Sequence, residues 1–160
     1  MPSLRRGIWH EDRYREATNA YGPYDNFDLE SSHVIPALIR KAVERQDPYV
    51  IWGTGEVSRD FIHARDISRG MMLALEKYHV ADPLNLGTGC EIKVKDLANL
   101  ILKLSGYENA RITFDRARPL GQLGRRADTR KAKEKMEFEA QISLEDGLRE
   151  TIDWYRKTSV

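Results

Sequence analysis

The sequence predicts an α/β fold, because short β-favouring runs alternate along the chain with stretches of helical periodicity. Residues 49–52 (YVIW) form a short apolar run that stops at a Gly-Thr-Gly turn. The segment 94–105 instead repeats leucine and isoleucine at the spacing of one helix face, with Gly106 supplying a left-handed end. Neither internal repeats nor low-complexity tracts interrupt this alternation.

The other elements follow from the same signals. The predicted strands are residues 49–52, 60–63, 83–87 and 111–114. The predicted helices run from Ser31 or Ser32 to about 45, over 67–78, over 94–105, over 129–137 and over 143–155. A basic loop covers residues 116–128, and the charged stretch 1–16 predicts a poorly packed arm.

Three of these helices carry recognisable start signals. Pro36 suits the first turn of its helix, where its missing N–H costs nothing. Asp66 is a natural N-cap for the helix over 67–78, in which Ile67, Met71, Met72 and Leu75 fall near one face. Ser143 opens a capping box in which Asp146 replaces the usual glutamate.

Bulk composition narrows the class of protein. The chain has 160 residues, 41% hydrophobic and 32% charged, which suits one domain with a real core. A net charge of +1 gives no global attraction to nucleic acid or to an anionic membrane. No apolar stretch approaches the ~20 residues of a membrane span, and no signal-peptide pattern is expected. Cys90 is the only cysteine, so the chain cannot form an internal disulfide, and we expect the protein in a reducing cytoplasm. Cys90 itself is either a reactive thiol or a small residue in a turn.

The segment 18–38 holds the first candidates for chemistry. Asn19 offers a donor and an acceptor beside a Tyr-Gly-Pro turn, either to a ligand or to an Asx-type bond that closes this turn. His33 lies at a helix start, where a neutral imidazole can exchange a proton near pH 7 or simply make a local hydrogen bond.

Further candidates surround the two glycine turns. Trp52 offers either a stacking face or a core side chain, and Arg59 either a clamp for a diphosphate or an exposed charge. A possible phosphate-facing loop contains Arg116, Arg118, Arg125 and Arg126. The four histidines are far apart and no Cys-x-x-Cys pair occurs, so no metal site is predicted.

The order of these motifs resembles one family. The segments are 19–28 (NAYGPYDNFD), 31–41 (SSHVIPALIRK), 50–66 (VIWGTGEVSRDFIHARD), 85–89 (NLGTG) and 142–155 (ISLEDGLRETIDWY). They are similar to the extended short-chain dehydrogenases/reductases of the NAD-dependent epimerase/dehydratase family, and within it to the GDP-L-fucose synthase group. The resemblance implies the C-terminal portion of an extended Rossmann-type nucleotide-sugar epimerase, a small mixed α/β substrate lobe over 17–160.

The resemblance also implies roles for matching positions. His33 would be the catalytic acid of the epimerisation steps. The cofactor-binding positions for NAD(P) would be Ala17, Thr18, Asn19 and Ala20. The substrate-binding positions for a GDP- or UDP-sugar would be Asn19, Lys41, Trp52, Arg59 and Arg118. The partner would be a second copy in a homodimer or a missing Rossmann half, with neither nucleic acid nor membrane.

The chain departs from the family pattern in its reaction machinery. It has no Gly-x-Gly-x-x-Gly turn, no Tyr-x-x-x-Lys pair and no partner cysteine, and Leu120 replaces an acidic residue of the family. We therefore expect no turnover by this chain alone, and NAD(P) binding by it alone is not expected.

Two hypotheses of different classes remain. The first is the substrate-binding part of a nucleotide-sugar epimerase/reductase. The second is a non-enzymatic partner-binding module or a subunit of a split enzyme, in which residues 84–87 would pair with the sheet of a missing half. Nucleic-acid binding through the basic run 125–135 is disfavoured, because Glu134 interrupts it and no aromatic residues are interleaved.

Overall fold

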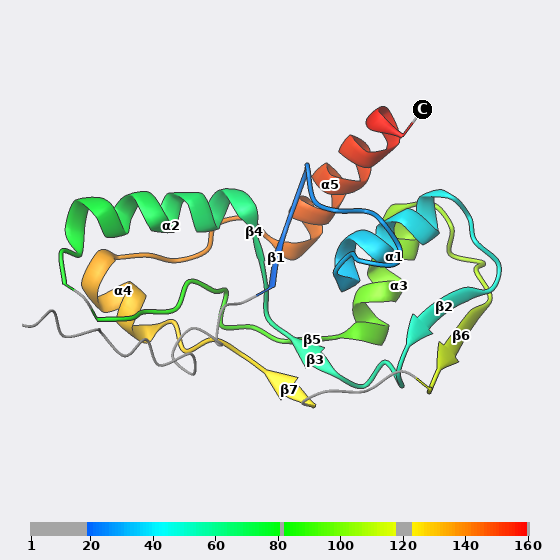
Figure 1. Cartoon of the computed structure of the whole chain (residues 1–160), viewed down its shortest axis with the longest axis horizontal. Helices are drawn as coiled ribbons and strands as arrows, with labels where there is room; N and C mark the ends of the chain where they lie inside the picture. The colour runs from blue at the N-terminus through cyan, green and yellow to red at the C-terminus, as the bar shows by residue number, and fades with distance from the viewer. Residues whose placement is uncertain (1–18, 81, 118–122, 160) are drawn as a thin grey trace, which may run out of the picture.

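The computed structural model describes residues 19–80, 82–117 and 123–159, and its mixed α/β architecture confirms the predicted class (Figure 1). The helices are α1 (Val34–Val43), α2 (Ala64–Lys77), α3 (Val94–Leu104), α4 (Arg130–Met136) and α5 (Leu144–Thr158). The strands are β1 (Asn19–Tyr21), β2 (Tyr49–Trp52), β3 (Ser58–Arg59), β4 (Phe61–His63), β5 (Ile92–Lys93), β6 (Ile112–Asp115) and β7 (Gly124–Arg125). The expected arm over 1–16 lies outside the described residues.

The strands form three small sheets rather than one. β1 pairs with β4, and β2 pairs with β6, each in parallel. The third sheet has the order β5-β3-β7, antiparallel on one side of β3 and parallel on the other. Its register places Arg59 beside Arg125.

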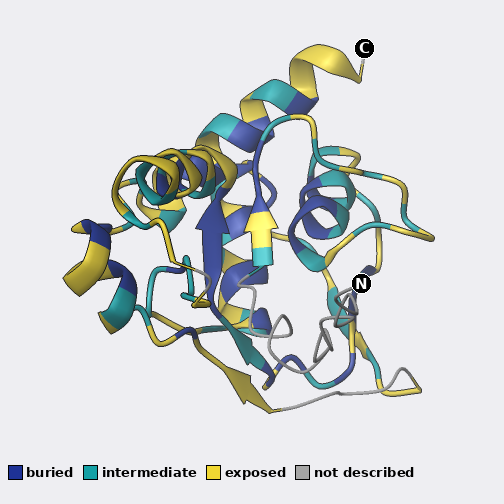
Figure 2. Cartoon of the chain, turned by 60° about the vertical axis from the view of Figure 1, so that its left-hand side comes forward, coloured by how far each residue is buried: buried dark blue, intermediate teal, exposed yellow. Residues whose placement is uncertain are grey.

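A large core lies at one end of the molecule. It gathers α1, α3, α5 and the strand β2, with Ile39, Leu97, Ile101 and Leu148 fully buried. Figure 2 shows the inner faces of these helices buried and their outer faces exposed. This packing follows from the 3.6-residue period of the apolar positions.

A small second core lies at the other end, between α2 and α4. Its buried members are Ile62, Ala132, Met136 and Phe138. Gly70 lets the helix approach closely, because an added Cβ would lie 2.8 Å from Leu86 and 2.9 Å from Phe138. The opposite face of α2 is exposed: Met71 and Met72 are each 58% accessible and Leu75 is 72% accessible.

The structure corrects two helix starts. α1 begins after His33, which makes no side-chain capping bond, rather than after Ser31 or Ser32. α2 begins after His63, whose Nδ1 accepts from the Arg65 N–H, so Asp66 is not the cap. Asp66 is buried instead, and its carboxylate accepts the backbone N–H groups of residues 141 and 142.

Residues 83–87 form no strand, which makes that prediction wrong. The sheets of the described ranges do not include them. Asn85 donates instead to the Asp128 carbonyl, and Leu86 packs against the small core. An apolar run becomes a strand only when a neighbour satisfies its backbone.

Other predictions hold. α3 matches the predicted segment and Gly106 has a φ of +64°. Ser143 caps α5 by accepting from the Asp146 N–H, as the capping box requires. None of the helices in the described ranges has the length and apolarity needed to cross a bilayer.

Candidate functional site

A cavity of about 290 Å³ opens where α1 meets β2 and β3. Five of the predicted site residues line this one cavity: Asn19, His33, Lys41, Trp52 and Arg59. Asn19 lies in β1, His33 and Lys41 at the two ends of α1, Trp52 at the end of β2, and Arg59 in β3. The fold therefore gathers positions that are up to forty residues apart in sequence. Apolar walls come from residues such as Val50, Ile51 and Val94.

The start of α1 contributes His33 and Ser32. His33 is exposed at the cavity and its side chain makes no capping bond to the helix. The Ser32 hydroxyl is buried and has no hydrogen-bond partner among the described residues, although it lines the cavity. A buried hydroxyl without a partner is unfavourable, and a polar ligand group could satisfy it.

Lys41 reaches the cavity from the last turn of α1. Its Nζ donates to the Val50 carbonyl at 2.9 Å and lies 5.7 Å from the centre of the Trp52 ring. Burial lowers the pKa of this ammonium group. The amine therefore sits half-buried between a strand backbone and an aromatic ring.

Trp52 ends β2, and its side chain is 49% accessible. It follows the buried Ile51, so the alternation of the strand turns the indole away from the core. An exposed indole at the mouth of a cavity offers a stacking face to a planar ring.

Arg59 approaches from β3, where its Nη1 donates to the Ser58 carbonyl at 2.6 Å. Burial lowers the pKa of this guanidinium, and the neighbouring charge of Arg125 lowers it further, while Glu91 acts in the opposite sense. Two arginines on adjacent strands repel each other, and an anion between them would relieve that repulsion.

Asn19 closes the far wall. Its backbone N–H and its Nδ2 both donate to the Asp60 carbonyl, at 3.2 and 3.0 Å. One hydrogen of the side-chain amide is therefore engaged by Asp60 within the protein.

The remaining predicted residues divide into two groups. Ala20 is exposed in β1 and does not line the cavity. Ala17, Thr18 and Arg118 lie outside the described residues. In the described part of the chain no group of three His, Cys, Asp or Glu side chains could hold a metal ion.

The sequence analysis did not predict Ser32 or Asp60 as site residues. Asp60 is 1% accessible, and its carboxylate accepts four hydrogen bonds from residues 88, 89 and 127. One available signal was an acidic residue at the start of an apolar strand, because a buried carboxylate requires dedicated donors.

Comparison with known proteins places this geometry in a family. Residues 16–87 match the family described as NAD dependent epimerase/dehydratase. GDP-L-fucose synthase 1 of Arabidopsis thaliana is 36% identical over 144 residues, which are 88% of this chain and 44% of that protein. Residues 16–87 carry the sequence pattern of the NAD dependent epimerase/dehydratase family. It spans less than half the length of this relative.

Solved structures of the family agree with the fold. A GDP-L-fucose synthetase from Naegleria fowleri superposes with a TM-score of 0.82 at 25% identity, over 89% of this chain and 45% of that one. UDP-glucose 4-epimerase from Thermotoga maritima, solved with UDP-glucose, gives a TM-score of 0.79 at 30% identity, over 90% and 45%. The chain therefore corresponds to one portion of these epimerases and reductases.

Proposed function

We propose that this chain is the substrate-binding part of an NAD(P)-dependent nucleotide-sugar epimerase/reductase of the GDP-L-fucose synthase type. The observation that carries the proposal is that Lys41, Trp52 and Arg59 line a single cavity. None of its described lining residues is acidic. Cations beside an aromatic ring suit a planar base attached to a diphosphate.

His33 is proposed as the acid that protonates the sugar during epimerisation. Its imidazole is exposed at the cavity and makes no capping bond, so its nitrogens remain accessible to a bound sugar. Epimerisation beside a ketone needs proton transfer at carbon, which a histidine can supply near neutral pH.

The residues present do not form a complete site for NAD(P). Asn19 and Ala20 are the described positions of the predicted cofactor segment, and the backbone N–H and one side-chain hydrogen of Asn19 are engaged by Asp60. The sequence has no glycine-rich dinucleotide turn and no Tyr-x-x-x-Lys pair. We therefore derive no hydride-transfer step, and propose that the chain alone binds substrate without turning it over, in a reducing cytoplasm.

Arg59→Ala tests the proposal. Removal of a charged contact to a diphosphate should weaken binding of GDP-mannose or UDP-glucose by about 2 kcal/mol, roughly thirtyfold. Tryptophan fluorescence titration of the purified chain measures this. Arg111→Ala is the matched control, because Arg111 is exposed and pairs with Asp47 outside the cavity.

The control should bind like the unchanged protein. If neither nucleotide sugar changes the fluorescence of the unchanged protein, or if both variants lose affinity equally, the substrate-binding proposal is wrong. Steady NADPH oxidation by the chain with a GDP-4-keto-6-deoxy sugar would contradict the claim that it is inactive alone.

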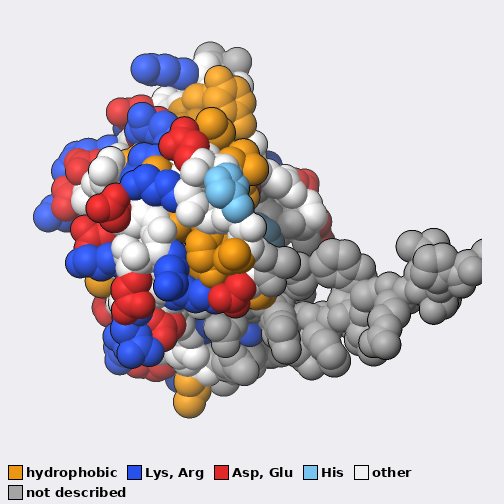
Figure 3. All heavy atoms as spheres, turned by 90° about the vertical axis from the view of Figure 1, so that its left-hand side faces the viewer, with side chains coloured by type: hydrophobic (Ala, Val, Ile, Leu, Met, Phe, Trp, Pro, Cys, Tyr) orange, Lys and Arg blue, Asp and Glu red, His pale blue; other side chains and the backbone are white. Residues whose placement is uncertain are grey.

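One observation favours the second candidate, a partner-binding module. The exposed face of α2 carries Met71, Met72 and Leu75, and Figure 3 shows hydrophobic side chains among charged ones at the end of the molecule where α2 and α4 lie. Within the described residues the β1–β4 sheet has two strands, and a parallel pair of this kind is rarely stable without further cover. A second copy of the chain, or a polypeptide that supplies further strands, would provide it.

Light scattering distinguishes the candidates. A concentration-dependent increase in mass, reduced when Met71, Met72 and Leu75 are all replaced by serine, supports association through α2. A monomer at every concentration, with or without the three substitutions, argues against the second candidate.

A further inference from the structure

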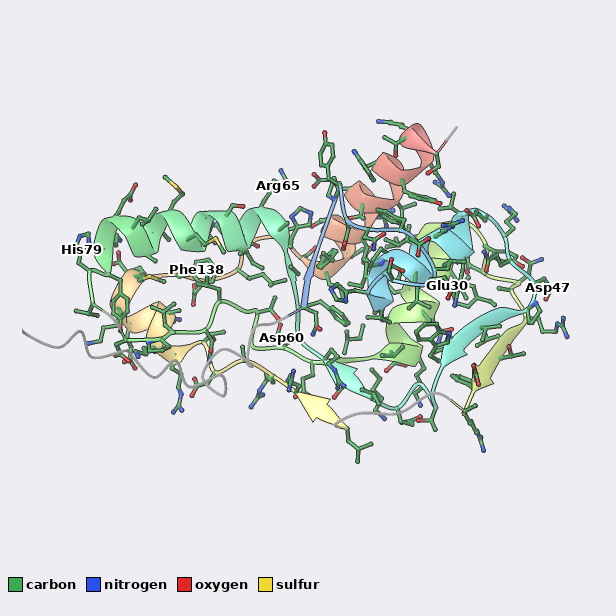
Figure 4. The ribbon with its side chains drawn as sticks, viewed as in Figure 1. Glu30, Asp47, Asp60, Arg65, His79 and Phe138 are labelled. Carbon is green, nitrogen blue, oxygen red and sulfur yellow. The ribbon has the colours of Figure 1, made fainter. Side chains whose placement is uncertain are left out.

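We propose that Asp60 is a positioning residue, which holds β7, and with it Arg125, against β3 beside Arg59, the arginine that lines the cavity. The inference rests on the proposed function and adds a residue that touches no ligand. Figure 4 shows Asp60 near the middle of the molecule, between the end that carries α2 and α4 and the end that carries α1 and α3.

The Asp60 carboxylate joins separate segments. Its Oδ1 accepts from the N–H and the hydroxyl of Thr88, at 3.1 and 2.5 Å. Its Oδ2 accepts from the N–H groups of Gly89 and Ala127, at 2.9 and 3.4 Å. The side chain is almost completely buried, so these donors replace water around the charge.

The Asp60 backbone joins two more segments. Its N–H donates to the Arg125 carbonyl at 3.1 Å, and its carbonyl accepts both donors of Asn19. A single residue thus links β1, the turn at 88–89, and β7 together with the residues that follow it.

β7 is only two residues long and exposed. The carbonyls of Leu123 and Arg125 accept from the N–H groups of Ser58 and Asp60 in β3 and the residue after it. Since Ala127 is held by the carboxylate, Asp60 anchors the strand at its exit as well as along its length. Both anchors act within two residues of Arg125.

The charges of Arg59 and Arg125 act against each other, and Glu91 offsets part of this effect. Arg59 and Arg125 are register partners in parallel strands. Like charges directly opposite each other destabilise a sheet, so the pair would separate if β7 were free. A fixed strand pairing keeps the two arginines beside each other, which lowers the cost of ordering them around one anion.

A purely structural role would look different, and Asp66 provides the comparison. Asp66 is also buried, at 2% accessibility, and accepts from the N–H groups of Gln141 and Ile142 and from Arg69. It belongs to α2 and does not line the cavity. Asp66→Asn therefore removes a comparable buried charge without disturbing the arginine pair.

The test compares Asp60→Asn with Asp66→Asn in the 160-residue chain. Each variant is titrated with UDP-glucose and GDP-mannose, and with uridine and guanosine, which lack the diphosphate. In Asp60→Asn an amide nitrogen replaces one carboxylate oxygen and faces N–H groups, so the side-chain attachment at Ala127 weakens while the backbone bond to Arg125 remains. We expect its affinity ratio of nucleotide sugar to nucleoside to fall about tenfold, and the ratio of Asp66→Asn to stay at the unchanged protein's value.

Thr88→Val provides a milder version if Asp60→Asn does not fold, because it removes one donor to the carboxylate. Its ratio should fall in the same direction by a smaller factor. Equal loss of nucleotide sugar and nucleoside binding, or an unchanged ratio in Thr88→Val and Asp60→Asn, would overturn the positioning role alone. If the unchanged protein does not prefer nucleotide sugars to nucleosides, the proposed function fails and this inference fails with it.

Discussion

The two ends of the molecule differ in how completely they bury their apolar surface. The end with α1, α3, α5 and β2 encloses a large core, whereas the end with α2 and α4 buries four hydrophobic residues and exposes Met71, Met72 and Leu75. The cavity lies against the large core. The walls of the proposed substrate site are therefore supported from within, while the α2 end has apolar surface available for another polypeptide.

The largest expected effect is a difference in the free energy of unfolding lost by one substitution at each end of the molecule. Ile101 is fully buried in the large core, so Ile101→Ala should lower the free energy of unfolding by about 2–5 kcal/mol. Met72→Ala on the exposed face of α2 should change it by about 0.5 kcal/mol or less. Urea unfolding followed by circular dichroism measures both. Similar losses in the two variants would mean that the α2 face is covered.

A smaller effect concerns the junction of the two ends. His63 caps α2, is 1% accessible, and lies edge-on to Tyr21 with ring centres 5.4 Å apart. Burial lowers its pKa, Arg65 lowers it further, and the carboxylates of Glu150 and Asp66 oppose the change. Its Nε2 lies 3.9 Å from Glu150 but has no hydrogen-bond partner among the described residues.

The sign of the pH dependence follows. In the unfolded chain histidine titrates near pH ~6.5, so the unfolded state takes up a proton at a higher pH than the folded state. The contribution to stability is complete above about pH 6.5 and decreases as the pH falls below it, by at most about 1.4 kcal/mol per pH unit. His63→Gln should flatten this slope between pH 7 and 5. His79→Gln, at the exposed end of α2, should leave it unchanged; equal slopes in all three proteins would contradict this role of His63.

Sequence reasoning worked best where the determinants are local. α3 and α5 were predicted because their periodicity and their ends, at Gly106 and Ser143, are visible within a dozen residues. The two-residue strands β3, β5 and β7 were not, because their pairing joins positions 58, 92 and 124, and no short window contains that information. The strand predicted at 83–87 failed for the same reason, since strand formation depends on pairing across the fold, and the sheets of the described ranges do not include this segment.

The candidate site shows the same division. Trp52 and Arg59 were recognised beside a glycine turn, and the resemblance contributed Lys41; the fold brings all three to one cavity. Asp60 and Ser32 were missed because their importance lies in hydrogen bonds across the fold, which the sequence does not display.

The most direct test of the central claim uses the indole N–H signals of the three tryptophans in a ¹⁵N-labelled chain. Trp52 lines the cavity. Trp154 lies on α5, where its ring contacts the rings of Tyr24 and Phe27. On titration with UDP-glucose or GDP-mannose we expect the Trp52 signal to shift and the Trp154 signal to stay in place. A Trp52 signal that does not move with either nucleotide sugar would contradict the proposed substrate site.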